Sequence, residues 1–392
     1  FVALGLFANG RQLYYGLEVT AMRDYASWGI YISNFVFFVA ISLVGSLITA
    51  VLRLTDVKWS TPLTRIAEII AVSAITFASI IIIVDMGRPE RFYNLFLHGR
   101  LQSPIIWDVI VITTYFFISV LLLYFPLLPD LKIMISNKAR FSKWQQKLYN
   151  FLGSFWKNKP AQFNITDKAI NILAIAIIPV AFSIHTVTSW LFATTYRPGW
   201  DSTNFGAYFI SGAFLVGAGG VVIAMYIFRT HYKLEKYITD DHFDKMSKVL
   251  VLLALLYLYF NFNEFLVPAF KMKKSEEDHL LGLFTGEFAP IFWFAIFTSM
   301  FIPIFILLFK KKYNYSFDKA YRKLIEKYQI ISSLYSSSYI LSFCFFPRYL
   351  YFCLLLVSAR VVKRVYKIVK LPKDKDVCDL RGQINEYYYK MK

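Results

Sequence analysis

Residues 64–108 decide the fold and read TRIAEIIAVSAITFASIIIIVDMGRPERFYNLFLHGRLQSPIIWD. After a basic start, the stretch contains a long run of nearly uncharged residues, then a carboxylate, a Gly-Arg-Pro turn and the beginning of another apolar run. A helix of roughly 20 residues, rising about 1.5 Å per residue, matches the ~30 Å hydrocarbon core of a bilayer. The stretch therefore predicts a transmembrane helix followed by a turn at the membrane edge.

The far end of this run is where we expect the chemistry. Asp85 lies at the edge of the apolar run, and Gly87, Arg88 and Pro89 follow it. Proline has no backbone N–H and disfavours helical geometry in the residue before it, so the helix is expected to end here. Ionisable groups inside or at the edge of a membrane are functional candidates by default. Arg88 and Arg91 would hold Asp85 ionised and in position, but a purely structural cap for the turn is the alternative.

The composition predicts an all-α, polytopic membrane protein. The chain has 392 residues, of which 57% are hydrophobic and 19% aromatic, more than a soluble core needs. Its formal charge of +18 could suggest nucleic acid, yet the Lys and Arg residues cluster between apolar runs. Membrane topology and anionic lipid headgroups explain that distribution better, so we expect no nucleic-acid partner.

No redox metal is expected to be held by this chain itself. The three cysteines, Cys344, Cys353 and Cys378, form no CxxC or CxxCH motif, so neither an iron–sulfur cluster nor a c-type haem is predicted. Only His185 of the five histidines falls inside a well-defined span, which disfavours a haem held by two histidines. Any redox metal would therefore belong to a partner protein.

Eight apolar runs are long enough to span a membrane. They lie at residues 28–52, 66–86, 105–128, 169–194, 205–228, 247–270, 288–309 and 331–358. The last contains Pro347 and Arg348, so it is expected to be kinked, re-entrant or split. We divide the chain into residues 1–27, the end of a first span and an amphipathic connector; 28–195, a first four-helix bundle; 196–330, the start of a second bundle; and 331–392, a last hydrophobic segment with a basic tail.

The distribution of basic residues predicts the orientation. The loops at 53–65, 129–168, 229–246 and 310–330 together contain 22 Lys and Arg residues, whereas the opposite set contains nine. Because basic loops remain in the cytoplasm, the turn at Arg88 should face outward in a cytoplasmic membrane. The longest loop contains a plausible amphipathic helix at residues 139–156, which would lie on the lipid headgroups or serve as a docking surface for a partner.

Glu68 shares a helix with Asp85 but lies near the other membrane face. The 17 residues between them correspond to about 25 Å along a helix. The two carboxylates could begin and end a proton path. Alternatively, Glu68 sits at the headgroup level and pairs with Arg65.

His185 and three polar residues elsewhere complete the candidates. A buried histidine can take up or release a proton near neutral pH, but His185 could equally bond to neighbouring hydroxyls between helices. Asn261 and Glu264 end the 247–270 span much as Asp85 ends its own, which suits either a second polar pocket or simple capping. Asp108 lies just inside the 105–128 span, where a structural salt bridge to Arg88 is expected.

Nothing in the sequence matches a nucleotide-binding loop, an HExxH metal motif or a nucleophile elbow. Chemistry by this chain alone is therefore not expected. The polar residues instead suit an amphiphile whose protonable head lies between helices and whose tail lies in lipid. A transporter or proton channel without redox partners, and a structural anchor for another subunit, are the alternative classes.

Five motifs in order resemble one family. SWGIYISNFVFFVAI, TPLTRIAE, DMGRPERFYN, QSPIIWDV and SIHTVTSWLFATTYRPGW resemble the NrfD/PsrC family of membrane subunits, most of all the quinol-interacting subunits of alternative complex III and related membrane-bound reductases. The resemblance covers roughly residues 10–310. It implies two four-helix bundles, no haem, and a menaquinol pocket in the first bundle at the outer face, beneath a ferredoxin-like iron–sulfur subunit that exchanges the electrons.

The resemblance also implies roles for individual residues. Asp85 and His185, with Asp108 nearby, would contact the quinone head, Arg88 would hold the turn, and Glu68 would belong to a proton route toward the cytoplasm. Asp85 replaces a histidine found before the Gly-Arg-Pro turn in relatives, and Leu191 replaces an acid. A paralogue that serves structure or proton passage without binding quinone is therefore an alternative within the same type of complex.

Overall fold

Helices make up all the regular secondary structure of the residues that the computed structural model describes. These residues are 2–20, 29–55, 61–136, 142–195, 200–232, 234, 238–271 and 273–308. The helices are α1 (Val2–Tyr15), α2 (Ile30–Leu54), α3 (Thr61–Asp85), α4 (Asn94–Leu97), α5 (Pro104–Ser136), α6 (Lys143–Leu152), α7 (Pro160–Ala193), α8 (Phe205–Tyr232), α9 (Asp240–Lys271), α10 (Lys274–Phe284), α11 (Ala289–Ile296) and α12 (Ile302–Leu308). A π-helical segment, Phe297–Phe301, joins α11 to α12, and short 3₁₀ turns lie at Leu17–Thr20 and Pro89–Arg91.

Six of these helices are long and apolar enough to cross a membrane: α2, α3, α5, α7, α8 and α9. A seventh is counted if α10 and the α11–α12 segment, bent by 73° at their junction, form one broken span. The predicted all-α, polytopic membrane class is confirmed. The eighth predicted run, 331–358, lies outside the described residues, as does the basic tail.

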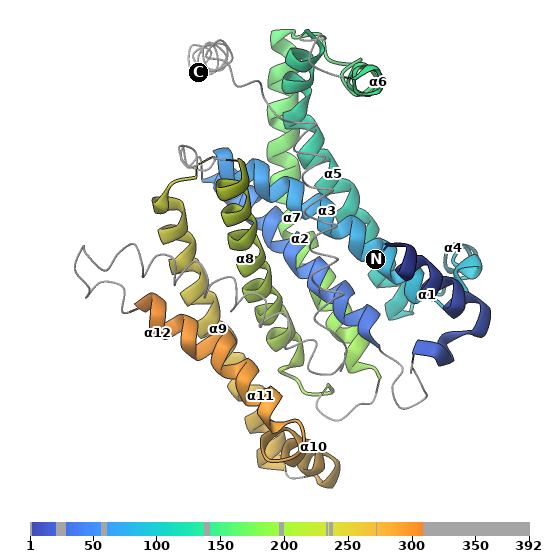
Figure 1. Cartoon of the computed structure of the whole chain (residues 1–392), viewed down its shortest axis with the longest axis vertical. Coiled ribbons are helices and arrows are strands. Elements are labelled where there is room, and N and C mark those ends of the chain that lie inside the picture. The colour runs from blue at the N-terminus through green and yellow to red at the C-terminus, as the bar shows by residue number, and fades with distance from the viewer. Residues whose placement is uncertain are drawn as a thin grey trace.

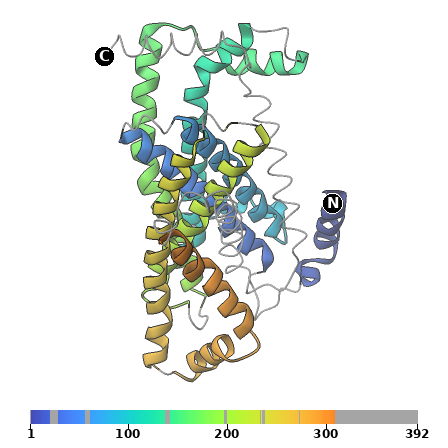
Figure 2. The ribbon, with the colours of Figure 1, turned by 60° about the vertical axis from the view of Figure 1, so that its left-hand side comes forward.

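Helices α2, α3, α5 and α7 form a closed four-helix bundle, because each helix packs against the next and α7 returns to α2. Figures 1 and 2 show these helices crossing one another at a tilt, with α2 between α8 and the rest of its own bundle. Helix α2 is correspondingly the most buried span. Its residues from Phe35 to Leu43 are almost all hidden from solvent, so this helix forms the centre of the core.

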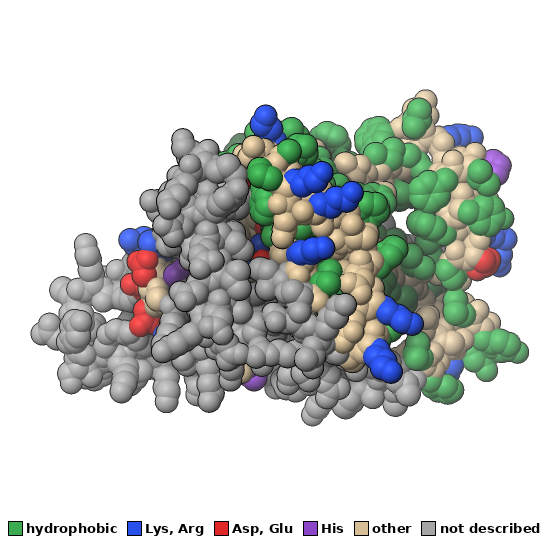
Figure 3. All heavy atoms as spheres, turned by 90° about the horizontal axis from the view of Figure 1, so that it is seen from above, with side chains coloured by type: hydrophobic (Ala, Val, Ile, Leu, Met, Phe, Trp, Pro, Cys, Tyr) green, Lys and Arg blue, Asp and Glu red, His purple; other side chains and the backbone are tan. Residues whose placement is uncertain are grey.

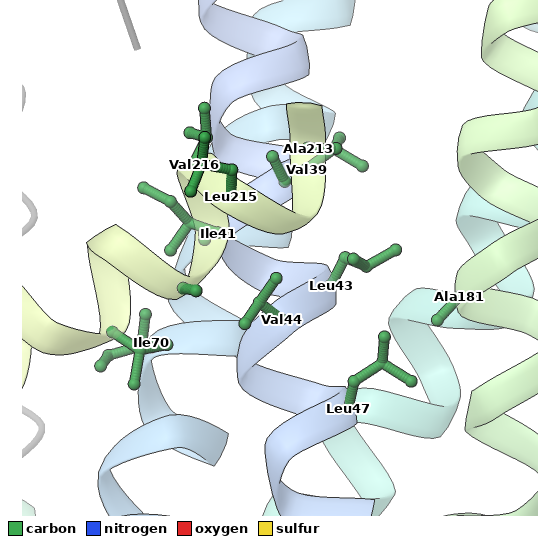
Figure 4. Packing of buried hydrophobic residues seen from close by; sticks show 14 of the residues in the cluster. Val39, Ile41, Leu43, Val44, Leu47, Ile70, Ala181, Ala213, Leu215 and Val216 are labelled. Carbon is green, nitrogen blue, oxygen red and sulfur yellow. The ribbon is translucent and has the colours of Figure 1, made fainter. Parts of the chain in front are cut away.

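Small residues bring α2 close to both of its neighbours. A Cβ atom added at Gly217 of α8 would lie 2.3 Å from the Ala40 carbonyl oxygen of α2, and one added at Gly45 would lie 2.8 Å from the Ala67 carbonyl oxygen of α3. Figure 4 shows Val39 and Ile41 of α2 packed against α8, whereas Leu43 points toward Ala181 of α7. Without a hydrophobic driving force in lipid, close approach at small residues is a main source of helix association.

The second group of helices begins with α8, which packs on α2, α7 and α3. Helix α9 packs against α8, while α10 and α12 pack against α9. Helix α1 is a single helix that continues from Val2 to Tyr15, and its buried Gln12 contacts the end of α3. Helix α6 packs against the far end of α5 (Figure 1).

Candidate functional site

Asp85 is the last residue of α3, where the sequence predicts the helix to end. One of its carboxylate oxygens is buried and accepts no hydrogen bond from any described residue. Beside it, the buried Gln12 side chain donates to the Val84 carbonyl (2.9 Å) and accepts a hydrogen bond from the Tyr31 hydroxyl (2.8 Å). Helices α1, α2 and α3 therefore meet at Asp85. Sequence reasoning did not single out Gln12 or Tyr31.

The turn after α3 is exposed. Arg88 precedes the 3₁₀ turn Pro89–Arg91, and its carbonyl accepts from the Arg91 backbone N–H at 3.0 Å. Both arginine side chains are exposed, and the ion pairs within the described part of the chain include none between them and Asp85 or Asp108. The expected Arg88–Asp108 salt bridge is therefore wrong, because Asp108 faces the bundle interior while Arg88 faces solvent.

Asp108 instead bonds across the bundle to α7. It lies in the second turn of α5 and is 7% exposed, and the Thr188 hydroxyl is 2.7 Å from its Oδ1. The same hydroxyl lies 2.7 Å from the Ile184 carbonyl, so it has one proton for two acceptors. This contact joins residues 80 positions apart and fixes the start of α5 to the end of α7.

His185 is buried one turn from Thr188 on α7. Its exposed fraction is 1%, and neither ring nitrogen has a hydrogen-bond partner among the described residues. The ring lies edge-on to Phe209 of α8, with centroids 5.8 Å apart. Since residues three apart share a helix face, His185 lies on the side of α7 that holds Asp108. His185 thus lies one helical turn from the Thr188 hydroxyl that contacts Asp108, while no described contact joins His185 itself to Asp108 or to Asp85.

A column of hydroxyl groups fills the middle of the first bundle, and sequence reasoning missed it. The Tyr115 hydroxyl of α5 is 3.1 Å from the Ser42 hydroxyl and 2.7 Å from the Ser46 hydroxyl, both on α2. Ser46 in turn lies 3.5 Å from Ser119, and Ser42 donates to the Ala71 carbonyl of α3 at 2.7 Å. The sequence signal for this column was the spacing of Ser42 and Ser46 on α2. Residues four apart lie on one helix face, so this spacing indicates a polar stripe.

Glu68 lies at the opposite end of the bundle within a charged cluster. Arg65 is 3.8 Å from Glu68 and 3.5 Å from Asp130, and Arg53 pairs with Asp167. This is the pairing expected if Glu68 sits at the headgroup level. One Glu68 oxygen is nevertheless buried without a hydrogen bond from a described residue. Asp167 is 18 residues from His185 on α7, so the two ends of the bundle are about 27 Å apart.

Asn261 and Glu264 belong to a separate polar cluster in the second group of helices. The Ser202 hydroxyl lies 2.7 Å from both carboxylate oxygens of Glu264, and the Asn204 amide donates to one of them at 3.2 Å. Asn261 is buried beside Tyr208. These groups gather at the start of α8, where free backbone N–H groups favour a carboxylate. The structure does not bring them together with His185 or Asp85.

Comparison with known proteins places the chain in a family. The family model for polysulphide reductase, NrfD, matches residues 18–317. The chain is 29% identical over 224 residues to a putative membrane subunit of the dimethyl sulfoxide reductase of Halobacterium salinarum, covering 57% of this chain and 48% of that protein. It is 23% identical over 321 residues to a subunit of the selenate reductase of Mesobacillus selenatarsenatis, covering 79% and 74% of the two chains.

A third relative is the integral membrane subunit of a menaquinone reductase of Nitratidesulfovibrio vulgaris, 26% identical over 139 residues, which cover 35% of this chain and 33% of that protein. The matched region thus spans about half of the Halobacterium protein and a third of the Nitratidesulfovibrio protein. The family match covers most of the described helices, from the 3₁₀ turn before α2 to beyond α12. The chain belongs to the NrfD family of reductase membrane subunits.

Proposed function

We propose that this chain is the quinone-reactive membrane subunit of a respiratory oxidoreductase, and that menaquinol binds at the outer end of the first bundle. The observation that carries the proposal is His185, which is buried while both of its ring nitrogens lack a described partner. The relation to a menaquinone reductase subunit supports the same ligand class. Electrons would pass to an iron–sulfur subunit that covers the outer turn at Arg88.

The polar groups at this end suit a quinone head. A buried donor or acceptor without a partner costs about 1–3 kcal/mol, so a ligand that supplies partners there gains that amount. One ring nitrogen of a neutral histidine donates and the other accepts, which matches the carbonyl and hydroxyl oxygens of the two redox forms. Menaquinol supplies two electrons and two protons when it is oxidised. Asp85 and Asp108 are the carboxylates that we assign to accept those protons.

The test uses the purified complex with a soluble menaquinol analogue. We expect His185→Gln and Asp85→Asn to lower kcat/KM by roughly 10- to 100-fold, the range that corresponds to one lost hydrogen bond to a charged or reacting group. The matched control is His231→Gln, since His231 is exposed at the other end of α8. Quinol oxidation at the full rate by both site variants would refute the proposal.

A proton route through the same bundle is the second part of the proposal. Tyr115 lies seven residues after Asp108 on α5, which is two helical turns along the same face. The hydroxyl column from Ser42 to Ser119 continues from there toward the charged cluster that contains Glu68. Chains of hydrogen-bonded hydroxyls can hand protons along their length.

This route is tested by proton uptake in liposomes that contain the complex. Tyr115→Phe should lower the number of protons moved per electron while quinol binding stays within a factor of two. Tyr259→Phe is the control, because Tyr259 is exposed on α9. Unchanged proton movement in Tyr115→Phe would exclude this route and favour a protein without proton transport.

A further inference from the structure

Helix α6 is held firmly against the far end of α5. Ser142 caps its N-terminus together with Gln145, each side chain bonding to the backbone of the other residue. On the inner face Tyr149 is fully buried against α5, next to Leu131. At the far end the Leu152 carbonyl accepts a hydrogen bond from the Tyr124 hydroxyl of α5 at 2.7 Å. The helix is therefore part of the folded domain and presents one fixed face outward.

The depth of α6 follows from the contacts of α5. The Pro126 carbonyl accepts from the Arg65 guanidinium at 2.8 Å, and the same guanidinium lies 3.5 Å from Asp130. A charged group of this kind marks the edge of the hydrocarbon core. Tyr124, the anchor of α6, lies two residues before Pro126 on the same helix. The C-terminal end of α6 is thus at the level of the headgroups.

The direction of α6 is also that of an interfacial helix. In Figure 1 the helix is seen nearly end-on while α5 and α7 are seen from the side, and Figure 2 shows it lying across α5. A helix that runs across the spans at headgroup depth lies along the membrane surface.

The outward face of α6, with the turn that follows it, combines bulky aromatic side chains with lysines. Trp144, Phe151 and Phe155 are 65%, 74% and 78% exposed, which is unusual for side chains of this size in water. Lys143 and Lys147 are also exposed, one turn apart. On a helical projection at 100° per residue, Lys143 and Lys147 lie next to Trp144 and Phe151. The exposed face of α6 therefore has a basic side and an adjacent aromatic side.

The charge around α6 is of one sign. Between Asp130 and Asp167 the sequence contains seven Lys and Arg residues and no Asp or Glu. Figure 3 looks onto the end where α5, α6 and α7 meet and shows Lys and Arg side chains gathered there beside hydrophobic ones. Aromatic side chains favour the boundary between headgroups and acyl chains, while lysines extend toward phosphates.

We infer that α6 is an anionic-phospholipid-binding element. The aromatic residues Trp144, Phe151 and Phe155 insert at the headgroup–acyl boundary, and Lys143 and Lys147 bind lipid phosphates. The inference does not depend on the proposed quinone site, which lies at the other end of the bundle.

The first experiment places Trp144 relative to the lipid. The full chain, with any subunits that co-purify, is reconstituted into nanodiscs whose lipids carry bromine near the headgroup end of the acyl chains. The difference between the fluorescence of the wild type and that of Trp144→Phe is the emission of Trp144. We expect brominated lipid to quench this Trp144 emission strongly. If this emission is insensitive to brominated lipid, α6 is away from the bilayer. If the Trp144 emission is also insensitive to a water-soluble quencher, another protein covers this side chain. Either result overturns the inference.

The second experiment measures the preference for anionic lipid. Native mass spectrometry compares bound phosphatidylglycerol with phosphatidylcholine for the wild type and Lys143→Gln/Lys147→Gln. Each surface lysine near an anionic membrane contributes roughly a fivefold preference, so the double variant should lose about 25-fold. The control Lys273→Gln/Lys274→Gln removes two exposed lysines at the start of α10. An equal loss in both variants, or no loss in either, contradicts a site on α6.

Discussion

The contact between Thr188 and Asp108 makes one prediction that can be followed quantitatively. Thr188→Val keeps the shape of the side chain and removes only the hydroxyl, which lies 2.7 Å from Asp108 Oδ1. Asp108 is buried, so the variant leaves a carboxyl group without that donor. A buried polar group left unpaired in this way destabilises a protein by about 1–3 kcal/mol.

Two assays should report the loss. Thermal unfolding in detergent should begin several degrees lower, because about 1 kcal/mol corresponds to roughly 2–4 °C in a domain of 150–250 residues. The KM for a menaquinol analogue should rise as well, since Asp108 on α5 would no longer be held to the α7 segment that carries His185. The conservative variant Thr188→Ser, which keeps the hydroxyl, should restore both values.

The control is Thr186→Val on the same helix. The Thr186 hydroxyl bonds to the Phe182 carbonyl of its own helix, so its removal should leave α5 and quinol binding unaffected. If Thr188→Val and Thr186→Val behave alike in both assays, the cross-helix bond does not hold the site together and the reasoning fails.

Three further variants test the packing and the charged cluster. Gly217→Ala would place a Cβ against the Ala40 carbonyl and should destabilise the α2–α8 contact by about 1–3 kcal/mol, measured by thermal unfolding against Gly282→Ala, where nothing lies within 4 Å. Arg65→Gln should lower the melting temperature, because it leaves the buried Glu68 carboxylate without the Arg65 cation. The double variant Arg65→Gln/Glu68→Gln should recover much of that loss, and no recovery would argue against coupling between the two residues. Gln12→Leu breaks the bonds that hold α1 to the end of α3, so α1 should be cleaved faster in limited proteolysis, and an unchanged cleavage rate would contradict that anchoring role.

The helices were largely predictable because a bilayer imposes a length on apolar runs. The end of α3 at Asp85 coincides with the Gly-Arg-Pro turn, as the absence of a proline N–H requires. The predicted end of α5 and the predicted starts of α7 and α9 fell short, since hydropathy marks the lipid-crossing part of a helix and says nothing about polar turns that extend it. Helix α7, for example, begins at Pro160 rather than near residue 169.

The contacts within the site were not predictable, because they depend on how distant helices are rotated. Asp108 was expected to pair with Arg88 across the turn, but its rotation on α5 directs it toward Thr188. The same applies to Gln12, whose partner Val84 is 72 residues away. The roles of Asp85, Arg88, Asp108, His185, Glu68, Asn261 and Glu264 stay proposals. The structure joins Asp108 to Thr188, one turn from His185, and leaves Asp85 beside Gln12 and Tyr31; Asn261 and Glu264 lie apart from both.

The central claim is that quinol binds at the outer end of the first bundle, and photolabelling tests it most directly. The purified complex is irradiated with an azido-quinone, and the labelled peptides are mapped with and without excess menaquinol analogue. The account predicts competed labelling of the α7 segment around His185 and of the start of α5 around Asp108. Competed labelling confined to the α8–α9 cluster at Glu264, or no competed labelling of this chain, would contradict it.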